Sequence, residues 1–219
     1  AQLVSTYERA LEQRNNLLKD RFVPAELLAA WDDAIVSAGA SVLVHRLALL
    51  ERVRTRLVEV YGAIAPRETV DVRYRASVGD IPADESRDRE AVASHLSRAL
   101  AETREEERRR GLTLVGPHRD EVVFMIDGRE ARSFASQGQQ RSVVLSLKMA
   151  EAAAAAAITG EHPVLLLDDV LSELDDGRKQ YLLTRMREKQ TFVTSCDDTA
   201  FLKTDGEVYR MNGGVLSKI

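Results

Sequence analysis

Apolar positions in the first half of the chain recur at steps of three and four residues, the pattern of amphipathic helices. The pattern predicts four helices, at about residues 1–20, 24–38, 40–64 and 87–110. The third is the most regular, with apolar side chains at Leu43, Leu47, Leu50, Val53, Leu57 and Tyr61. Pro24 suits the first turn of a helix, whereas Gly39 and Pro66 are typical of helix ends. Alternating apolar and charged residues within 69–77 indicate a half-buried strand.

The second half of the chain changes to short apolar runs separated by helices. Strands are predicted at 112–115, 122–126, 164–167 and 192–194, helices at about 138–158 and 177–188, and a closing hairpin at 208–216. Asp127-Gly128 is a hairpin-turn signal. The β-α-β-α-β order predicts a parallel sheet with crossover helices. We therefore expect an all-helical arm, or lever, domain at 1–110 and an α/β lobe at 111–219.

The composition fits an ordered and soluble protein, with 44% hydrophobic and 30% charged residues among 219. The run from Ala152 to Ile158 is far too short for a membrane span, so we expect a cytoplasmic protein with no membrane partner. The lone Cys196 excludes a disulfide framework and suits a reducing compartment. Because the net charge is −4, any nucleic-acid binding must rest on a local basic patch.

An acid pair follows the apolar run at residues 164–167. In nucleotide hydrolases a buried strand that ends in this way is the Walker B arrangement. Asp168 would hold Mg²⁺, directly or through water, and Asp169 would polarise the attacking water. The alternative is a strand that happens to end in an acidic turn.

Ser136-Gln137-Gly138-Gln139-Gln140 opens the long helix and resembles the signature loop of ABC ATPases. Glycine lets a backbone approach a phosphate, and a helix N-terminus favours an anion. The alternative is that Ser136 is an ordinary N-cap. Downstream, Ser172-Glu173-Leu174-Asp175 resembles the D-loop of the same ATPases. The three motifs occur in the ABC order with a single helix between the first two, and this combination is far more specific than any one of them.

Further segments narrow the resemblance to the RecF family of bacterial recombination-repair proteins, which are SMC/ABC-type ATPases. They are Gly116-Pro117-His118-Arg119-Asp120, residues 136–141, Leu145 to Glu151 and residues 166–175, within about 111–176. The implied fold is α/β, the C-terminal half of an ABC-type ATPase head (a P-loop NTPase-like parallel sheet with helices) plus the helical arm.

The resemblance also implies a function, with ATP and Mg²⁺ as cofactors. Two heads would join in an ATP-dependent homodimer with weak ATPase activity, and the signature loop would contact the nucleotide held by the other subunit. The nucleotide-contacting residues would be Ser136, Gln137, Gly138, Gln139, Asp175 and Ser195. Implied partners are double-stranded DNA, single-strand/double-strand DNA junctions and RecR, with RecO and RecA in the pathway, and the implied location is the nucleoid.

Two departures from the family pattern affect these expectations. No G-x-x-x-x-G-K-[ST] occurs in the chain, so half of a nucleotide site is missing; in the family this loop lies in a segment before the arm. We therefore expect the chain to be the C-terminal portion of a longer protein and to be inactive alone. ABC heads also carry a histidine after the strand that follows the D-loop. Here Ser195 or Thr194 would substitute for it, or another group would contact the γ-phosphate.

Basic residues of the arm form two clusters. Arg46, Arg52, Arg54 and Arg56 have few acids nearby and are the candidate DNA contacts. The second cluster is Arg104, Arg108, Arg109 and Arg110; Glu102, Glu105, Glu106 and Glu107 lie at helical spacing from these arginines, which favours a solvated face.

Three other functions share part of this pattern. The nucleotide-binding subunit of an ABC transporter would lack so long a helical arm. Another SMC-like head would carry a long heptad coiled coil, whereas this arm is short and interrupted. A non-enzymatic helical adaptor would not need an acid pair after a buried strand.

Overall fold

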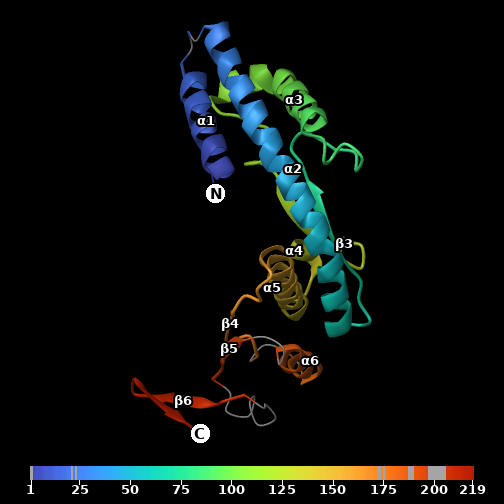
Figure 1. The fold of residues 1–219 in the computed structure, drawn as a ribbon. Helices are drawn as coiled ribbons and strands as arrows, with labels where there is room; N and C mark the ends of the chain where they lie inside the picture. The colour runs from blue at the N-terminus through green and yellow to red at the C-terminus, as the bar shows by residue number, and fades with distance from the viewer. Residues whose placement is uncertain are drawn as a thin grey trace. The chain divides into compact units, whose positions relative to one another are not determined.

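The computed structural model describes all residues except 1, 21, 23, 172, 173, 175, 187–189 and 197–205 (Figure 1). Its helices are α1 (Gln2–Leu18), α2 (Ala25–Ile64), α3 (Arg89–Arg110), α4 (Ala131–Phe134), α5 (Gln137–Thr159) and α6 (Asp176–Met186). Its strands are β1 (Val70–Arg75), β2 (Glu121–Ile126), β3 (Arg129–Glu130), β4 (Leu165–Asp168), β5 (Thr191–Thr194), β6 (Tyr209–Asn212) and β7 (Val215–Lys218).

The chain forms two compact units. Unit 1 comprises Ala1–Thr55 and Asp71–Glu130, and unit 2 comprises Arg56–Val70 and Ala131–Ile219. Residues 111–130, which the sequence pattern placed with the ATPase lobe, lie in unit 1.

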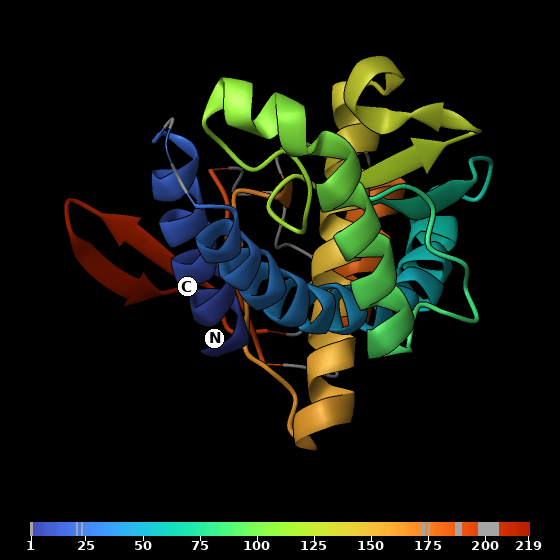
Figure 2. The same cartoon turned by 90° about the horizontal axis from the view of Figure 1, so that it is seen from above.

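Three helices of unit 1, α1, α2 and α3, pack side by side around one apolar core (Figures 1 and 2). The core residues include Tyr7 of α1, Ile35 and Val42 of α2, and Leu96 and Leu100 of α3. These positions follow the three- and four-residue spacing of the sequence, so the predicted inward faces are confirmed. Burial of each such side chain contributes about 1.5–3 kcal/mol, which is what holds the helices together.

The predicted helix break at Gly39 is wrong, because α2 runs without interruption from Ala25 to Ile64. A Cβ atom at Gly39 would lie 2.8 Å from Leu96 Cδ2 and 3.1 Å from Tyr7 Cε2. The glycine is therefore a close-packing position, where α1 and α3 both approach the backbone of α2.

The predicted strand at 112–115 is also wrong, since this segment is irregular. Its backbone groups bond to side chains instead of to a neighbouring strand. Thr113 N–H donates to Asn15 Oδ1 (2.7 Å), and Leu114 N–H donates to Glu107 Oε1 (2.7 Å). These side chains satisfy the polar groups that a sheet would otherwise pair, so no ladder is required.

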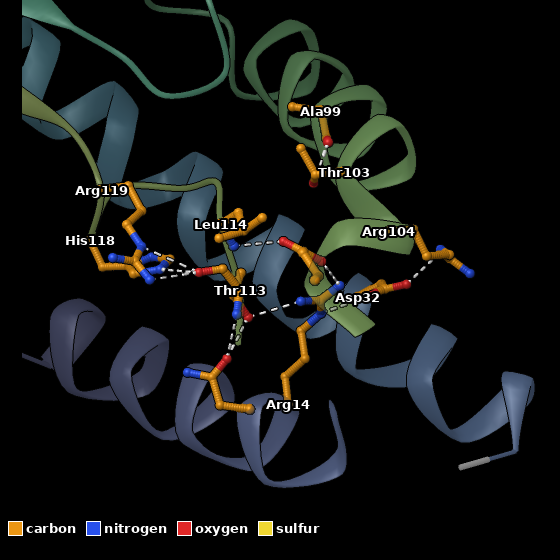
Figure 3. A network of polar contacts seen from close by, with 11 residues as sticks. Arg14, Asp32, Ala99, Thr103, Arg104, Thr113, Leu114, His118 and Arg119 are labelled. Carbon is orange, nitrogen blue, oxygen red and sulfur yellow. Dashed lines mark hydrogen bonds and ion pairs between the residues drawn. The ribbon is translucent and has the colours of Figure 1, made fainter. Parts of the chain in front are cut away.

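A buried ion network joins the three helices to this irregular segment (Figure 3). The fully buried Arg14 guanidinium donates to Asp32 Oδ1 (2.7 Å), Glu107 Oε2 (2.7 Å) and Thr113 Oγ1 (2.8 Å). Arg104 completes the network with a 2.6 Å bond to Asp32 Oδ2. The expectation that the 104–110 glutamates are solvated fails for Glu107, which is fully buried.

Unit 2 carries the parallel strand pair that the sequence predicted. Strand β4 pairs in parallel with β5, with Leu166 opposite Phe192 and Asp168 opposite Thr194. One face of the pair packs through Leu167 and Val193 onto a core formed by α5, α6 and the end of α2. The other face is open: Leu166 is 76% exposed and Phe192 is 58% exposed. The expectation that β4 is a buried strand is therefore wrong for this face in the described chain.

Both predicted hairpins are confirmed. The β2–β3 turn has Asp127 and Gly128 at φ 47° and 76°, and the β6–β7 turn has Gly213 and Gly214 at φ 56° and 82°. Two successive residues with positive φ are the turn geometry that matches the twist of paired strands.

Two helices, Glu26–Ile64 and Gln137–Thr159, are long and apolar enough to cross a membrane by length and composition alone. Core helices of soluble proteins share this property, and 44% and 39% of the two apolar windows are buried inside the protein.

Candidate functional site

The acid pair lies at the carboxyl end of β4 and is tied to the neighbouring strand. Asp169 N–H donates to the carbonyl oxygen and to Oγ1 of Thr194, at 3.1 Å in each case. The Thr194 hydroxyl in turn donates to Asp168 Oδ1. Thr194 therefore holds both carboxylate-bearing residues. The sequence analysis named it only as a substitute for the missing histidine.

The backbone of Asp169 lies in the left-handed region, with φ 49°. Aspartate tolerates this region better than most side chains, although the conformation costs of order 1 kcal/mol or more. The two bonds from its N–H to Thr194 retain it there. The resulting sharp turn leaves both carboxylates exposed at the sheet edge, where a ligand can reach them.

The segment resembling the signature loop begins α5, as predicted. Ser136 is its N-cap and forms a capping box with Gln139: Gln139 N–H donates to Ser136 Oγ (3.2 Å), and Ser136 N–H donates to Gln139 Oε1 (2.9 Å). In this cap the Ser136 oxygen is the acceptor, so its hydroxyl hydrogen is not used by the capping bond. The capping role and a phosphate-binding role are therefore compatible.

Nothing in the described part of the structure requires a glycine at position 138. Its φ is not left-handed, and an added Cβ would meet only Arg178 Nη1, at an ordinary 3.6 Å. Glycine in a helix costs up to about 1 kcal/mol relative to alanine. Neither the turn nor the packing explains that cost. Close approach of a ligand to this backbone would explain it.

Arg178 of α6 is a residue that the sequence analysis missed. Its Nη1 donates to the carbonyl oxygen of Gly138 (3.0 Å) and to Ser142 Oγ (2.6 Å). It thereby fixes the first turn of α5, and its charge is partly balanced by Glu68, whose Oε1 lies 3.8 Å from Arg178 Nη2. Because Arg178 lies forty residues beyond Gly138 with no motif of its own, local sequence gives no signal for the contact.

The remaining predicted nucleotide contacts are placed only in part. Gln137 is exposed in the first turn of α5, and Ser195 is partly buried directly after β5. Asp175 lies outside the described residues, with Ser172 and Glu173. Across the described ranges no cluster of three or more His, Cys, Asp or Glu side chains could hold a metal. A cation at Asp168 would therefore need most of its ligands from elsewhere, as Mg²⁺ bound to a nucleotide does.

The four arginines predicted to contact DNA are all exposed on α2, but three of them bind protein groups. Arg46 donates to the carbonyl oxygen of Pro117, Arg54 Nε donates to Asp71 Oδ1 (2.9 Å), and Arg56 pairs with Glu59 (2.7 Å). Arg52 makes no hydrogen bond or ion pair with the part of the chain that the structure describes.

His118 lies in a hydrogen-bonded part of the fold, between Tyr7 and Thr113. Tyr7 Oη lies 2.7 Å from His118 Nδ1, and His118 Nε2 lies 3.2 Å from the carbonyl oxygen of Thr113. Burial raises the pKa of the Tyr7 hydroxyl, which keeps it a neutral donor. The neutral histidine with its proton on Nε2 satisfies both contacts. Burial of the ring also lowers the pKa of His118, so the neutral form is favoured in the folded state.

We therefore expect His118 to make the stability of unit 1 depend on pH. Above about pH 6.5 the neutral His118 contributes its full stabilisation to the free energy of unfolding. As pH falls below that value, the unfolded chain takes up the proton before the folded chain does, so this contribution is progressively lost. The difference in melting temperature between the wild type and His118→Gln should shrink between pH 7.5 and pH 5. Circular dichroism measures it, with the exposed His162→Gln as control. A constant difference across this range would contradict the assignment.

The chain is similar to known proteins in sequence and in fold. No family model matches the chain. Curated relatives do: "DNA replication and repair protein RecF" of Symbiobacterium thermophilum is 43% identical over 96% of the chain, and that of Heliobacterium modesticaldum is 40% identical over 99%. The chain spans 57% and 59% of the lengths of these two relatives.

Solved structures of the recombination mediator protein RecF in the RecFOR pathway share the fold. The RecF-ATPrS structure superposes with a TM-score of 0.82 at 30% identity, and the RecF-ATP structure with 0.83 at 29%. Each match covers 99% of this chain and 58% or 57% of the solved one. The expected α/β fold is thus confirmed, and the chain belongs to the RecF family.

Proposed function

We propose that the chain carries the Walker B and signature half of the ATP site of a RecF-type recombination-repair protein. Such a protein dimerises on ATP, binds DNA at gaps and junctions, and assists the loading of RecA together with RecR and RecO. The names of the relatives and the nucleotide complexes of the solved RecF structures support this function. The single observation that carries it is the acid pair that Thr194 holds at the edge of β4.

Each residue at this edge has a chemical role in the proposal. Asp168, exposed and oriented by the Thr194 hydroxyl, would hold the Mg²⁺ that neutralises charge on the nucleotide phosphates. Asp169 would accept a hydrogen bond from the attacking water and orient it. The bonds from Asp169 N–H to Thr194 keep this carboxylate from drifting, and such positioning is the larger part of phosphoryl-transfer catalysis.

The open face of β4 and β5 supports a site completed by another segment. Strands of parallel sheets are normally covered on both faces, yet Leu166 and Phe192 are exposed on the same face as Asp168 and Thr194. The chain also contains no G-x-x-x-x-G-K-[ST]. We infer that a segment carrying the phosphate-binding loop covers this face in the working protein.

The α5 N-terminus would act on the nucleotide of a second subunit. The N–H groups of Gln137 and Gly138, which the capping box does not use, and the Ser136 hydroxyl hydrogen form a surface complementary to a phosphate. This surface would be used only when two heads meet, so ATP would favour the dimer by binding between them.

Ser136→Arg should therefore block ATP-driven dimerisation and spare ATP binding to the monomer. The larger side chain removes the cap and occupies the phosphate position, and lost bonds to a charged group weaken association by roughly 10- to 100-fold. Sedimentation of the complete protein with a non-hydrolysable ATP analogue measures the effect. Ser133→Arg, an exposed change on α4, is the matched control. If the Ser136 variant dimerises normally, the residue is only a helix cap.

DNA binding would depend on α2, with Arg52 and Arg56 as the proposed contacts. Arg52 has no partner among the described residues, and the exposed Arg56–Glu59 pair is weak enough to exchange for a phosphate. Arg46 is not proposed as a DNA contact, because it donates a hydrogen bond to the carbonyl oxygen of Pro117 and thereby stabilises the fold.

Arg52→Glu and Arg56→Glu should each lower duplex-DNA affinity and reduce the slope of log affinity against log salt by about one. Fluorescence anisotropy across a salt titration, with ATP present, measures both quantities. Arg87→Glu, the same change of charge in the loop before α3, is the control. An unchanged slope in both variants would move the DNA contacts to another surface.

A further inference from the structure

A groove of about 460 Å³ lies where the C-terminal ends of α1 and α3 meet in unit 1. Its floor is apolar and is formed by Leu17, Leu18 and Leu28. Leu18 and Leu28 are buried, and Leu17 is half-buried. The volume is in the range of protein pockets that hold a side chain or a small ligand.

The rim of the groove is basic. Lys19, Arg108, Arg109 and Arg110 line it, against two acidic side chains, Asp20 and Glu105. Arg110 pairs with Glu106 at 2.5 Å. Arg108 and Arg109 are exposed and form no ion pair or hydrogen bond with the residues that the structure describes. A local excess of positive charge in a chain of net charge −4 favours an acidic partner.

Contacts between the ends of α1 and α3 form the inner side of the groove. Gly111 ends α3 with φ 68°, and a Cβ there would lie 3.5 Å from Lys19 Cγ, so the two helix ends are in contact. Arg14 of α1 and Glu107 of α3 form their buried ion pair next to the floor. A partner therefore meets a preformed surface, which lowers the ordering cost of binding.

Two exposed apolar side chains, Phe22 and Leu27, lie in the sequence between the groove residues Asp20 and Leu28. The side chain of Phe22 is 90% exposed and that of Leu27 is 45% exposed. The backbone of Phe22 is tied to the groove, since its N–H donates to Asp20 Oδ1 (3.0 Å).

We propose that this groove binds an acidic segment of a partner protein. Carboxylates of the segment pair with Arg108 and Arg109, and an apolar side chain enters over Leu17 and Leu28. Protein is favoured over nucleic acid because a phosphate backbone does not use an apolar floor, whereas an apolar side chain of a peptide does. The inference does not depend on the ATP site.

Selection from a displayed library of random decapeptides, followed by anisotropy with the enriched peptides, tests this. We expect enrichment of peptides that combine several Asp or Glu residues with a large apolar residue. The double variant Arg108→Glu/Arg109→Glu should bind them about 10-fold or more weakly, and added salt should weaken binding to the wild type. Arg87→Glu should bind like the wild type. The neutral double variant Arg108→Ala/Arg109→Ala, monitored by Trp31 fluorescence, separates loss of charge from loss of folding.

Three results would overturn the proposal. The first is that the library yields no peptide that depends on Arg108 and Arg109. The second is that the enriched peptides lack acidic residues, or bind the double variants as well as the wild type. The third is that the double variants lose affinity for a duplex oligonucleotide instead, which would make the groove a nucleic-acid contact.

Discussion

Arg14→Met is expected to destabilise unit 1 by about 3–5 kcal/mol, the usual cost of leaving one partner of a buried ion pair without the other. Arg14 and Glu107 are both fully buried, and their side chains meet at 2.7 Å. Without the guanidinium, the Glu107 carboxylate keeps only its bond from Leu114 N–H within the network. Denaturant unfolding followed by Trp31 fluorescence measures this, since the single tryptophan of the chain packs against the core of unit 1.

The double variant Arg14→Met/Glu107→Gln separates charge burial from packing. Glutamine keeps an oxygen for Leu114 N–H but carries no charge, so the double variant should be more stable than Arg14→Met alone. Arg9→Met, an exposed change on the same helix, should stay within about 0.5 kcal/mol of the wild type. If Arg14→Met also stays within that range, the network does not stabilise the fold.

Asp169→Asn in the complete protein is expected to reduce ATP hydrolysis by roughly 10²- to 10⁴-fold, the usual contribution of a positioned general base. Asparagine has the same size and adopts the left-handed region as readily as aspartate, so the turn at φ 49° and its bonds to Thr194 should be retained. ATP binding and ATP-driven dimerisation should therefore persist.

Single-turnover hydrolysis, combined with nucleotide binding by calorimetry, distinguishes the roles of the two acids. Asp168→Asn should weaken Mg²⁺–ATP binding as well as turnover, because it removes the proposed metal ligand. The 219-residue chain alone should show no turnover, since it has no phosphate-binding loop. Wild-type hydrolysis by Asp169→Asn would remove Asp169 from the chemistry.

Local patterns in the sequence determined those parts of this protein whose partners are near in the chain. The helix faces follow from a 3.6-residue period, and both hairpins follow from turn residues such as Asp127-Gly128, because these signals act within a few residues. The acid pair after an apolar run likewise predicted the carboxylate edge that β4 presents. The fold class and the family resemblance, both confirmed, depended on such local features and their order.

Only the tertiary structure decided what depends on distant partners. Gly39 lies inside α2, where its missing Cβ lets α1 and α3 approach the backbone, and 112–115 is irregular because Asn15 and Glu107 satisfy its polar groups. The burial of Arg14, and the positioning of the motifs by Thr194 and Arg178, could not be predicted. A local pattern predicts that a charged or hydroxyl side chain is exposed. Only the folded chain shows whether a distant group compensates for the burial of such a side chain.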